Sequence, residues 1–302
     1  MNIATRQNKT INLKRLAAQR QIYSEAKDLL NIQFLVCVVA AIVFAILANI
    51  LSDEFAIYPI TGAILCVLFN EVYLSKRIKK LTTKAAYIQE EFDCDVLLIP
   101  KNRMKEDFPE LLEIINYKSK KFLEKGNNYD LLKDWYPGIK EADISYGRII
   151  CQNTNCFWNK KLRERYSAYL AGFFWIIFIL LLVISIMNDL TLTSFIGAVL
   201  APLIPSIVFV YNIFAVNKDS ITKLNHIKIK LNEIIEKLKV KEHYPKEQLD
   251  NDIRSLQDLI FENRLIISLT PDKFYFRYRD RDEGIAAASN EELIDLINNR
   301  IQ

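Results

Sequence analysis

The densest group of side chains that could bind a ligand lies in residues 151–166. These residues read Cys-Gln-Asn-Thr-Asn-Cys-Phe-Trp-Asn-Lys-Lys-Leu-Arg-Glu-Arg-Tyr, a run that combines amides, aromatic rings and four cations. A guanidinium group can form two parallel hydrogen bonds with a phosphate, and an indole ring can stack on a nucleobase. The sequence therefore predicts an anion-binding site whose candidate ligand-binding residues are Trp158, Lys160, Lys161, Arg163 and Arg165.

The same run has a simpler explanation in its position directly before an apolar stretch. Aromatic rings are enriched at the level of the lipid headgroups, and cations bind anionic lipid there. An interfacial helix would present the same residues without binding a soluble ligand, and this interpretation is favoured over a binding site. Residues 274–279, Phe-Tyr-Phe-Arg-Tyr-Arg, leave the same two interpretations open and make the weaker case for a ligand.

A second group of interest lies inside an apolar stretch near residue 200. Small residues recur there at a spacing of four, and two prolines stand three residues apart. Small residues let helices approach closely, while prolines free backbone carbonyls and kink a helix. A bending helix that lines a pore and a kinked helix in a static bundle both explain the pattern. The candidate pore or gating residues are Gly197, Ala201, Pro202, Pro205 and Ser206.

Neither an active site nor a metal site is indicated elsewhere in the chain. The sequence contains no Gly-rich phosphate loop, no His-Glu pair spaced for zinc and no serine nucleophile elbow, and its seven glycines leave few places for such turns. Cys151 and Cys156 are too widely spaced for the usual short metal-binding pair, and both histidines lie far along the chain. We therefore expect a protein that is not an enzyme, with no catalytic residue, bound metal or cofactor.

Four apolar stretches must position these residues. Residues 33–51, 56–74, 168–187 and 193–216 are each close to or above the length that a helix needs to cross about 30 Å of hydrocarbon. None contains Lys or Arg, and Glu71 is their one acidic residue. Their central parts carry no ionisable group that could couple ions or protons, which disfavours a transporter. The pattern predicts four transmembrane helices in two hairpins.

The distribution of basic residues predicts the orientation of these helices. The short loops 52–55 and 188–191 contain no Lys or Arg, whereas the flanks at the opposite ends of the stretches are basic. Because basic loops stay in the cytoplasm, both termini and the segment between the hairpins are expected there. These flanks also explain the net charge of +4, so a DNA or RNA polymer is not an expected partner. We expect a multi-pass protein of the cell inner membrane, with the lipid bilayer as its partner.

The segment between the hairpins is expected to be a small mixed α/β module. Residues 92–100 predict a short buried strand that Pro100 stops. Residues 105–125 predict a helix that ends at Gly126, and residues 134–138, Asp-Trp-Tyr-Pro-Gly, predict a turn.

The C-terminal part is expected to be helical. Apolar residues at steps of three and four predict a long amphipathic helix through Leu238, broken by Pro245 before a second helix that begins at Leu249. Ser289 and Glu292 predict the capped start of a last short helix. The expected fold is a mainly α, polytopic membrane protein. Its parts are an amphipathic cytoplasmic helix (1–31), a first transmembrane hairpin (33–74), a cytoplasmic module (75–166), a second transmembrane hairpin (168–216) and a cytoplasmic helical tail (217–302).

Taken together, these segments resemble the SMODS-associating four-transmembrane effector family. Each matching segment is short, but they follow one another in order along nearly the whole chain. The chain departs from the family's pattern at Asn153, where a basic residue is expected, and at Asn159, where an acid is expected. The matching segments are 6–8, 16–20 with Tyr23 and 26–27, 92–97, 134–137, 151–152 through Trp158 to 165–166, and 271–272 with 274–275.

The resemblance implies a pore-forming effector of bacterial anti-phage defence. Such a protein would respond to a nucleotide signal made on infection, with a cyclic oligonucleotide as the second messenger. It would then permeabilise the membrane of the infected cell and act as a homo-oligomer. The alternative from another class is a membrane-anchored sensor or scaffold that binds a cytoplasmic partner without permeabilising the bilayer.

Overall fold

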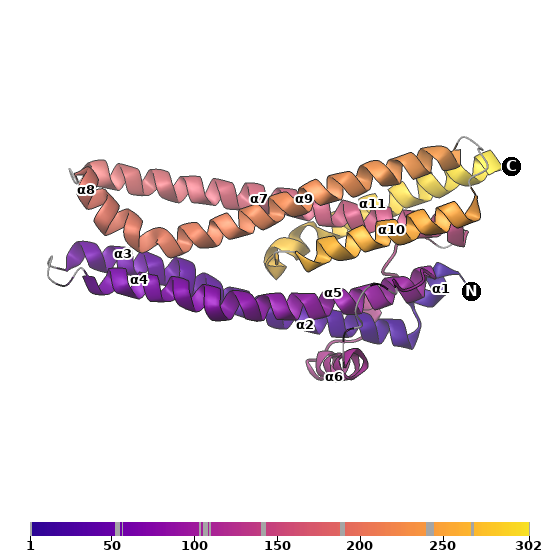
Figure 1. Ribbon diagram of the computed structural model, residues 1–302, viewed down its shortest axis with the longest axis horizontal. Helices are drawn as coiled ribbons and strands as arrows, with labels where there is room; N and C mark the ends of the chain where they lie inside the picture. Colours follow the sequence, from indigo (N-terminus) through magenta and orange to yellow (C-terminus); the bar gives the residue numbers. More distant parts are fainter. Residues whose placement is uncertain are drawn as a thin grey trace. The chain divides into compact units, whose positions relative to one another are not determined.

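The computed structural model describes residues 2–51, 55, 57–102, 104, 108, 110–139, 143–187, 191–239, 245–266 and 269–301. Every regular element in these ranges is a helix (Figure 1). The chain divides into two compact units, which are described separately. Unit 1 comprises Met1–Glu25, Leu81–Arg163 and Asp219–Gln302, and unit 2 comprises Ala26–Lys80 and Glu164–Lys218.

Unit 2 contains all four apolar stretches. Two helical segments of the described chain, Thr10–Leu47 and Ile57–Leu97, are long and apolar enough to cross a membrane. Three π-helical segments interrupt the α-helices of the unit. Its elements are the end of α2 (Thr10–Phe34), η1 (Leu35–Val39, π), α3 (Ala40–Ile50), α4 (Ile57–Phe69), η2 (Asn70–Leu74, π), the start of α5 (Ser75–Leu97), the end of α7 (Ile144–Met187), α8 (Leu192–Ser194), η4 (Phe195–Leu200, π), η5 (Ala201–Leu203, 3₁₀) and the start of α9 (Ile204–Lys239).

Small side chains hold the helices of unit 2 together. Ala41 and Ala45, one turn apart on α3, are buried against Val199 and Leu203 of η4 and η5. Without water to drive apolar packing, helices in lipid associate through this kind of close van der Waals fit. The surface of the unit is strongly apolar, since Ile176 and many similar side chains are more than half exposed. A surface of this composition is stable in contact with lipid tails.

Unit 1 has a core of its own. Leu16 of α2, Phe92 of α5, Ile149 of α7, Leu231 of α9 and Ile253 of α10 are buried in one hydrophobic cluster. The periodic apolar faces predicted for the helices that are observed as α9 and α10 are the faces that pack. The elements of unit 1 are α1 (Ile3–Gln7), α2 up to Glu25, α5 from Leu81, α6 (Leu111–Glu124), η3 (Asp130–Leu132, 3₁₀), α7 up to Arg163, α9 from Asp219, α10 (Lys246–Leu265) and α11 (Asp272–Ile301).

The prediction of a mixed α/β module between the hairpins is wrong, because residues 92–97 form the last turns of the helix α5. Phe92, Val96 and Leu97 are all buried. Val96 follows Phe92 by four residues and Leu97 follows Val96 by one, so the three side chains lie on one face of a helix. A short apolar run does not by itself distinguish a buried strand from a buried helix. Pro100 follows the helix end, where Leu98 adopts a left-handed conformation with φ of 52°.

The helical predictions for the flanking segments are largely confirmed. The helix expected over 105–125 is observed as α6, which ends before Gly126 in the left-handed conformation (φ 80°), while residues 105–107 and 109 lie outside the described residues. The helix expected from Leu249 is α10. The prediction of a short last helix capped by Ser289 is wrong, because Asp272–Ile301 is one continuous helix, α11, and Ser289 lies in its interior.

We predict that Gly62 is required for the close packing of α3 on α4. A Cβ atom at Gly62 would lie 2.8 Å from Cζ of Phe44, so the ring would have to move. A Cβ atom at Gly197 would meet nothing within 4 Å in the described chain. Gly62→Ala should therefore be less stable than Gly197→Ala by about 1–3 kcal/mol, the usual cost of overpacking. Thermal unfolding of both variants in the same detergent measures the difference, and equal midpoints would contradict this packing.

Candidate functional site

A fully buried ion pair lies at the centre of unit 1. Nη1 of Arg264, on α10, is 2.7 Å from Oδ2 of Asp93, on α5, and the side chains are 1 % and 0 % exposed. Burial alone would lower the pKa of Arg264, but the surrounding groups, Asp93 first and then Tyr136 and Glu90, together raise that pKa. Breaking a buried pair is costly, because the remaining charge has no water to solvate it. The pair therefore ties α5 to α10.

Two hydrogen bonds, one from the turn at 134–138 and one from α10, also reach the Asp93 carboxylate. The Tyr136 hydroxyl donates to Oδ1 at 2.6 Å, and Nε2 of Gln257 donates to Oδ2 at 3.1 Å. Asn155 of α7 in turn donates to the Tyr136 oxygen at 2.9 Å. Burial, and beside it the Asp93 carboxylate, raise the pKa of Tyr136 well above its ordinary value, so the phenol stays a donor. The turn at 134–138 and α7 are thus held to the same carboxylate.

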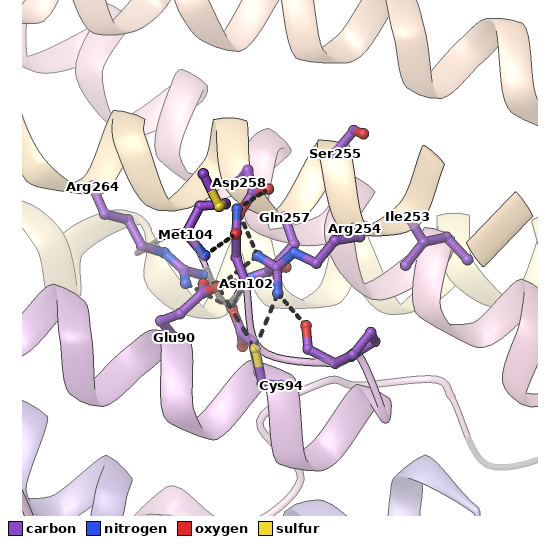
Figure 2. A network of polar contacts seen from close by, with 12 residues as sticks. Glu90, Cys94, Asn102, Met104, Ile253, Arg254, Ser255, Gln257, Asp258 and Arg264 are labelled. Atoms are coloured by element: carbon purple, nitrogen blue, oxygen red, sulfur yellow. Dashed lines mark hydrogen bonds and ion pairs between the residues drawn. The ribbon is translucent and has the colours of Figure 1, made fainter. Parts of the chain in front are cut away.

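A second set of polar contacts joins α5 to α10 around Arg254 (Figure 2). Its Nη2 donates to Glu90 and to Asp258, both at 2.7 Å. Its Nη1 donates to the Pro100 carbonyl at 2.9 Å, and Asn102 donates to the other oxygen of Asp258 at 2.9 Å. The chain that follows α5 is therefore held against α10 by one arginine. Both carboxylates are paired, as in a rigid support between helices.

The N-terminal residues complete this support through Asp95. Arg6 forms an ion pair with Asp95 Oδ1 at 2.8 Å, and Asn12 and Arg15 donate to Oδ2 at 2.9 and 3.0 Å. Asn8 contacts the turn, since its Nδ2 donates to Asp134 at 2.9 Å. Three of the segments by which the chain resembles the effector family, 6–8, 92–97 and 134–137, thus contact one another.

The predicted ligand-binding run does not form one site. On a helix, Trp158, Lys161 and Arg165 fall on one face, and Lys160 and Arg163 fall on the opposite face. The Trp158 indole donates to the Asp282 carbonyl of α11 at 3.3 Å, so it packs between helices. Whether any of the five binds a ligand stays a prediction.

Arg163 is the most buried of the five candidate residues. Its side chain is 4 % exposed, and burial lowers its pKa to about 10. Lys161 is exposed, whereas Lys160 and Arg165 are half-buried. Asn153, where the family has a basic residue, accepts a hydrogen bond from Lys228 of α9 at 2.6 Å, so the cation at this place comes from another helix.

The structure brings together a different group of cations and aromatic rings, on α2 and α11. The guanidinium carbon of Arg20 lies 5.6 Å from the ring centre of Phe276, which is 47 % exposed. Burial, and next the proximity of Arg279, lower the pKa of Arg20, so two guanidinium groups face the same region. Nε of Arg279 donates to Glu283 at 2.5 Å. We call Arg20, Tyr275, Phe276 and Arg279 the basic–aromatic surface.

Such a surface suits an anion that carries a planar group. Two guanidinium groups can bind a phosphate, and an exposed phenyl ring can stack on a base. Sequence reasoning noted residues 274–279 but missed Arg20. The two segments lie about as far apart in sequence as this chain allows, so no local pattern linked them.

The candidate pore residues lie where the fourth stretch is least regular. Gly197 belongs to the π-helical η4, Ala201 and Pro202 to the 3₁₀-helical η5, and Pro205 and Ser206 to the start of α9. The Ser206 hydroxyl donates to the carbonyl of Cys37, in η1, at 2.7 Å. The first and fourth apolar stretches are thus joined by a hydrogen bond from the start of α9 to the π-helical segment η1.

A family model described as the SMODS-associating 4TM effector domain matches residues 1–293. Neither the curated proteins nor the solved structures yielded a significant match.

We predict that Arg264→Met destabilises the protein by about 3–5 kcal/mol, because it leaves the Asp93 carboxylate buried without its cation. The matched control is Arg148→Met, which removes an ion pair of the same length, 2.7 Å, to Asp250, whose side chain is 38 % exposed. Water can solvate Asp250 after that change, so the loss should be smaller. Adding Asp93→Asn to Arg264→Met should restore part of the stability. Thermal unfolding in detergent tests all three variants, and equal losses for the two single variants would contradict the central role of this pair.

Proposed function

Because the chain belongs to the SMODS-associating 4TM effector family, we propose that it is a non-enzymatic effector that permeabilises the bacterial inner membrane when a nucleotide signal is made on infection. The membrane domain would be unit 2, and both termini would lie in the cytoplasm with unit 1. The observation that carries the proposal is the family match over nearly the whole chain. Four apolar stretches and the basic–aromatic surface support it from within the molecule.

Helix continuity offers a route from signal to membrane. The helices α2, α5, α7 and α9 each contribute residues to both units without interruption. A ligand shifts a conformational equilibrium only through a difference in its affinity for the two states. Arg20 lies on α2, so a ligand held there would act on a helix that leads directly into the first apolar stretch. Several copies would be needed to enclose a wide path, and the proposal therefore includes a homo-oligomer.

The trigger is proposed to be a cyclic oligonucleotide at the basic–aromatic surface. Its phosphates would bind between Arg20 and Arg279, and a base would stack on the exposed ring of Phe276. Binding would compete with the hydrogen bond between Arg279 and Glu283, so the bound and free states would differ in the contacts of α11. Arg163, one of the candidate ligand-binding residues on α7, is less suited to this role, because a side chain 4 % exposed is poorly placed for an incoming ligand.

We predict that Arg20→Gln and Phe276→Ala each weaken nucleotide binding at least tenfold. A charge-assisted hydrogen bond contributes roughly 1.5–3 kcal/mol, and stacking on an aromatic ring contributes roughly 1–3 kcal/mol. Arg277→Gln is the matched control, since Arg277 lies one residue from Phe276 and packs over Tyr278 at 5.8 Å. Titration of the detergent-purified full-length protein with a panel of cyclic di- and trinucleotides by calorimetry provides the measurement. Equal affinities for all variants would place the ligand elsewhere.

Permeabilisation distinguishes the proposal from its alternative, a sensor or scaffold that leaves the bilayer intact. Dye-loaded liposomes that contain the protein should release dye when the nucleotide panel is added. The double variant Pro202→Leu and Pro205→Leu should straighten the fourth stretch and reduce both release and toxicity on overexpression, at equal membrane levels. Full release by the double variant would leave the prolines a packing role only. Intact liposomes under all conditions would favour the scaffold.

A further inference from the structure

A cluster of polar side chains joins three helices of unit 2 beside Glu71. Nε2 of Gln33, on α2, donates to Asn70 Oδ1 at 2.6 Å and to the Ser75 hydroxyl at 3.2 Å. Nδ2 of Asn70 donates to Glu71 Oε1 at 2.8 Å. Asn212 of α9 donates to the same carboxylate oxygen at 3.4 Å. The cluster therefore connects both helices of the first hairpin to the fourth apolar stretch.

Glu71 is the one Asp, Glu, Lys, Arg or His residue in the four apolar stretches. Gln33 and Asn70 are 9 % and 2 % exposed, whereas Glu71 and Asn212 are exposed on the single chain. Within the described chain no hydrogen bond reaches Oε2 of Glu71. A charged group in a transmembrane segment is rarely turned to lipid and instead faces water or another helix. The carboxylate and the Asn212 amide thus mark the face of the unit that is turned away from lipid tails.

The backbone around this cluster is also specialised. Asn70 and Glu71 begin the π-helical segment η2, and Gln33 lies just before the π-helical segment η1. Single π-helical turns inside α-helices occur often at functional sites. The wider turn in η2 places a buried amide next to an exposed carboxylate, and the buried amide holds one carboxylate oxygen in place. The other oxygen is left to a ligand from outside.

The basic residues that follow the second apolar stretch do not cancel the charge of the Glu71 carboxylate. Lys76 and Arg77 are exposed and come more than one helical turn after the Asn70–Glu71 pair, where cations bind headgroup phosphates. Glu71 lies within the apolar stretch, where the effective dielectric constant is lower and a single charge acts more strongly on a passing ion. Carboxylate and amide oxygens are also the ligands that replace water around small hard cations.

We propose that Glu71, supported by Asn70, Gln33 and Asn212, is the ion-selecting site of the pore and that the pore conducts cations in preference to anions. This inference rests on the proposed function, since it presupposes a conducting state. One carboxylate from each copy in a homo-oligomer would form a ring at the basic end of unit 2. The ring attracts hydrated cations and repels anions.

The test is the permeability of the full-length protein in planar bilayers under a KCl gradient, with the panel of cyclic nucleotides on the side of unit 1. Wild type should conduct K⁺ in preference to Cl⁻. Glu71→Gln should lower the ratio of K⁺ to Cl⁻ permeability about tenfold, since one charge near a passing ion contributes of the order of 1.4 kcal/mol. Glu71→Asp keeps the charge and should keep the preference, which also controls for folding of the altered site.

The control variant is Glu124→Gln, the same loss of charge at an exposed position of α6 in unit 1. Its permeability ratio should equal that of wild type. An unchanged ratio in Glu71→Gln at normal conductance would overturn this inference and leave the proposed function standing. If wild type conducts nothing under any condition, the proposed function fails, and this inference fails with it.

Discussion

The ion pair between Asp93 and Arg264 is the interaction on which the arrangement of unit 1 depends. Its side chains are 0 % and 1 % exposed, so each charge is stable only because the other is close. The remaining oxygen of Asp93 is held by Tyr136, and Tyr136 is held by Asn155. One buried carboxylate thus brings α5, α7, α10 and the turn at 134–138 to a common centre. Substituting any one partner leaves a polar group buried and unpaired, and this cost makes the whole arrangement cooperative.

Unit 2 differs from unit 1 in having an apolar surface. Its polar groups must therefore find partners inside the unit. Ala41 and Ala45 allow close packing on η4 and η5, and Ser206 supplies a hydrogen bond to a carbonyl of the irregular segment η1. Breaks in helical regularity are tolerated in apolar surroundings only where such partners are present. The π-helical and 3₁₀ segments therefore lie at the helix contacts.

The two units share four helices, and this bears on how a signal could be passed. The proposed ligand surface lies on α2 and α11, and the proposed ion-selecting site is supported by Gln33, near the end of the same α2. A continuous helix transmits rotation or translation better than a flexible linker, because its backbone hydrogen bonds resist bending. The proposed trigger and the proposed selector would thus be joined by backbone rather than by loops.

The sequence by itself determined the four apolar stretches, the long amphipathic helix through Leu238, the helix from Leu249 and the turn at 134–138. These features depend on local composition and periodicity, which are present in any stretch of the chain. Sequence patterns misassigned residues 92–97 as a strand and Ser289 as a helix cap. A short apolar run occurs in both strands and helices, and a capping pattern also occurs inside helices. Tertiary structure alone decided which charges meet. It brought Arg20 to Phe276 and paired Asp93 with Arg264, because contacts between distant segments depend on packing that no local pattern encodes.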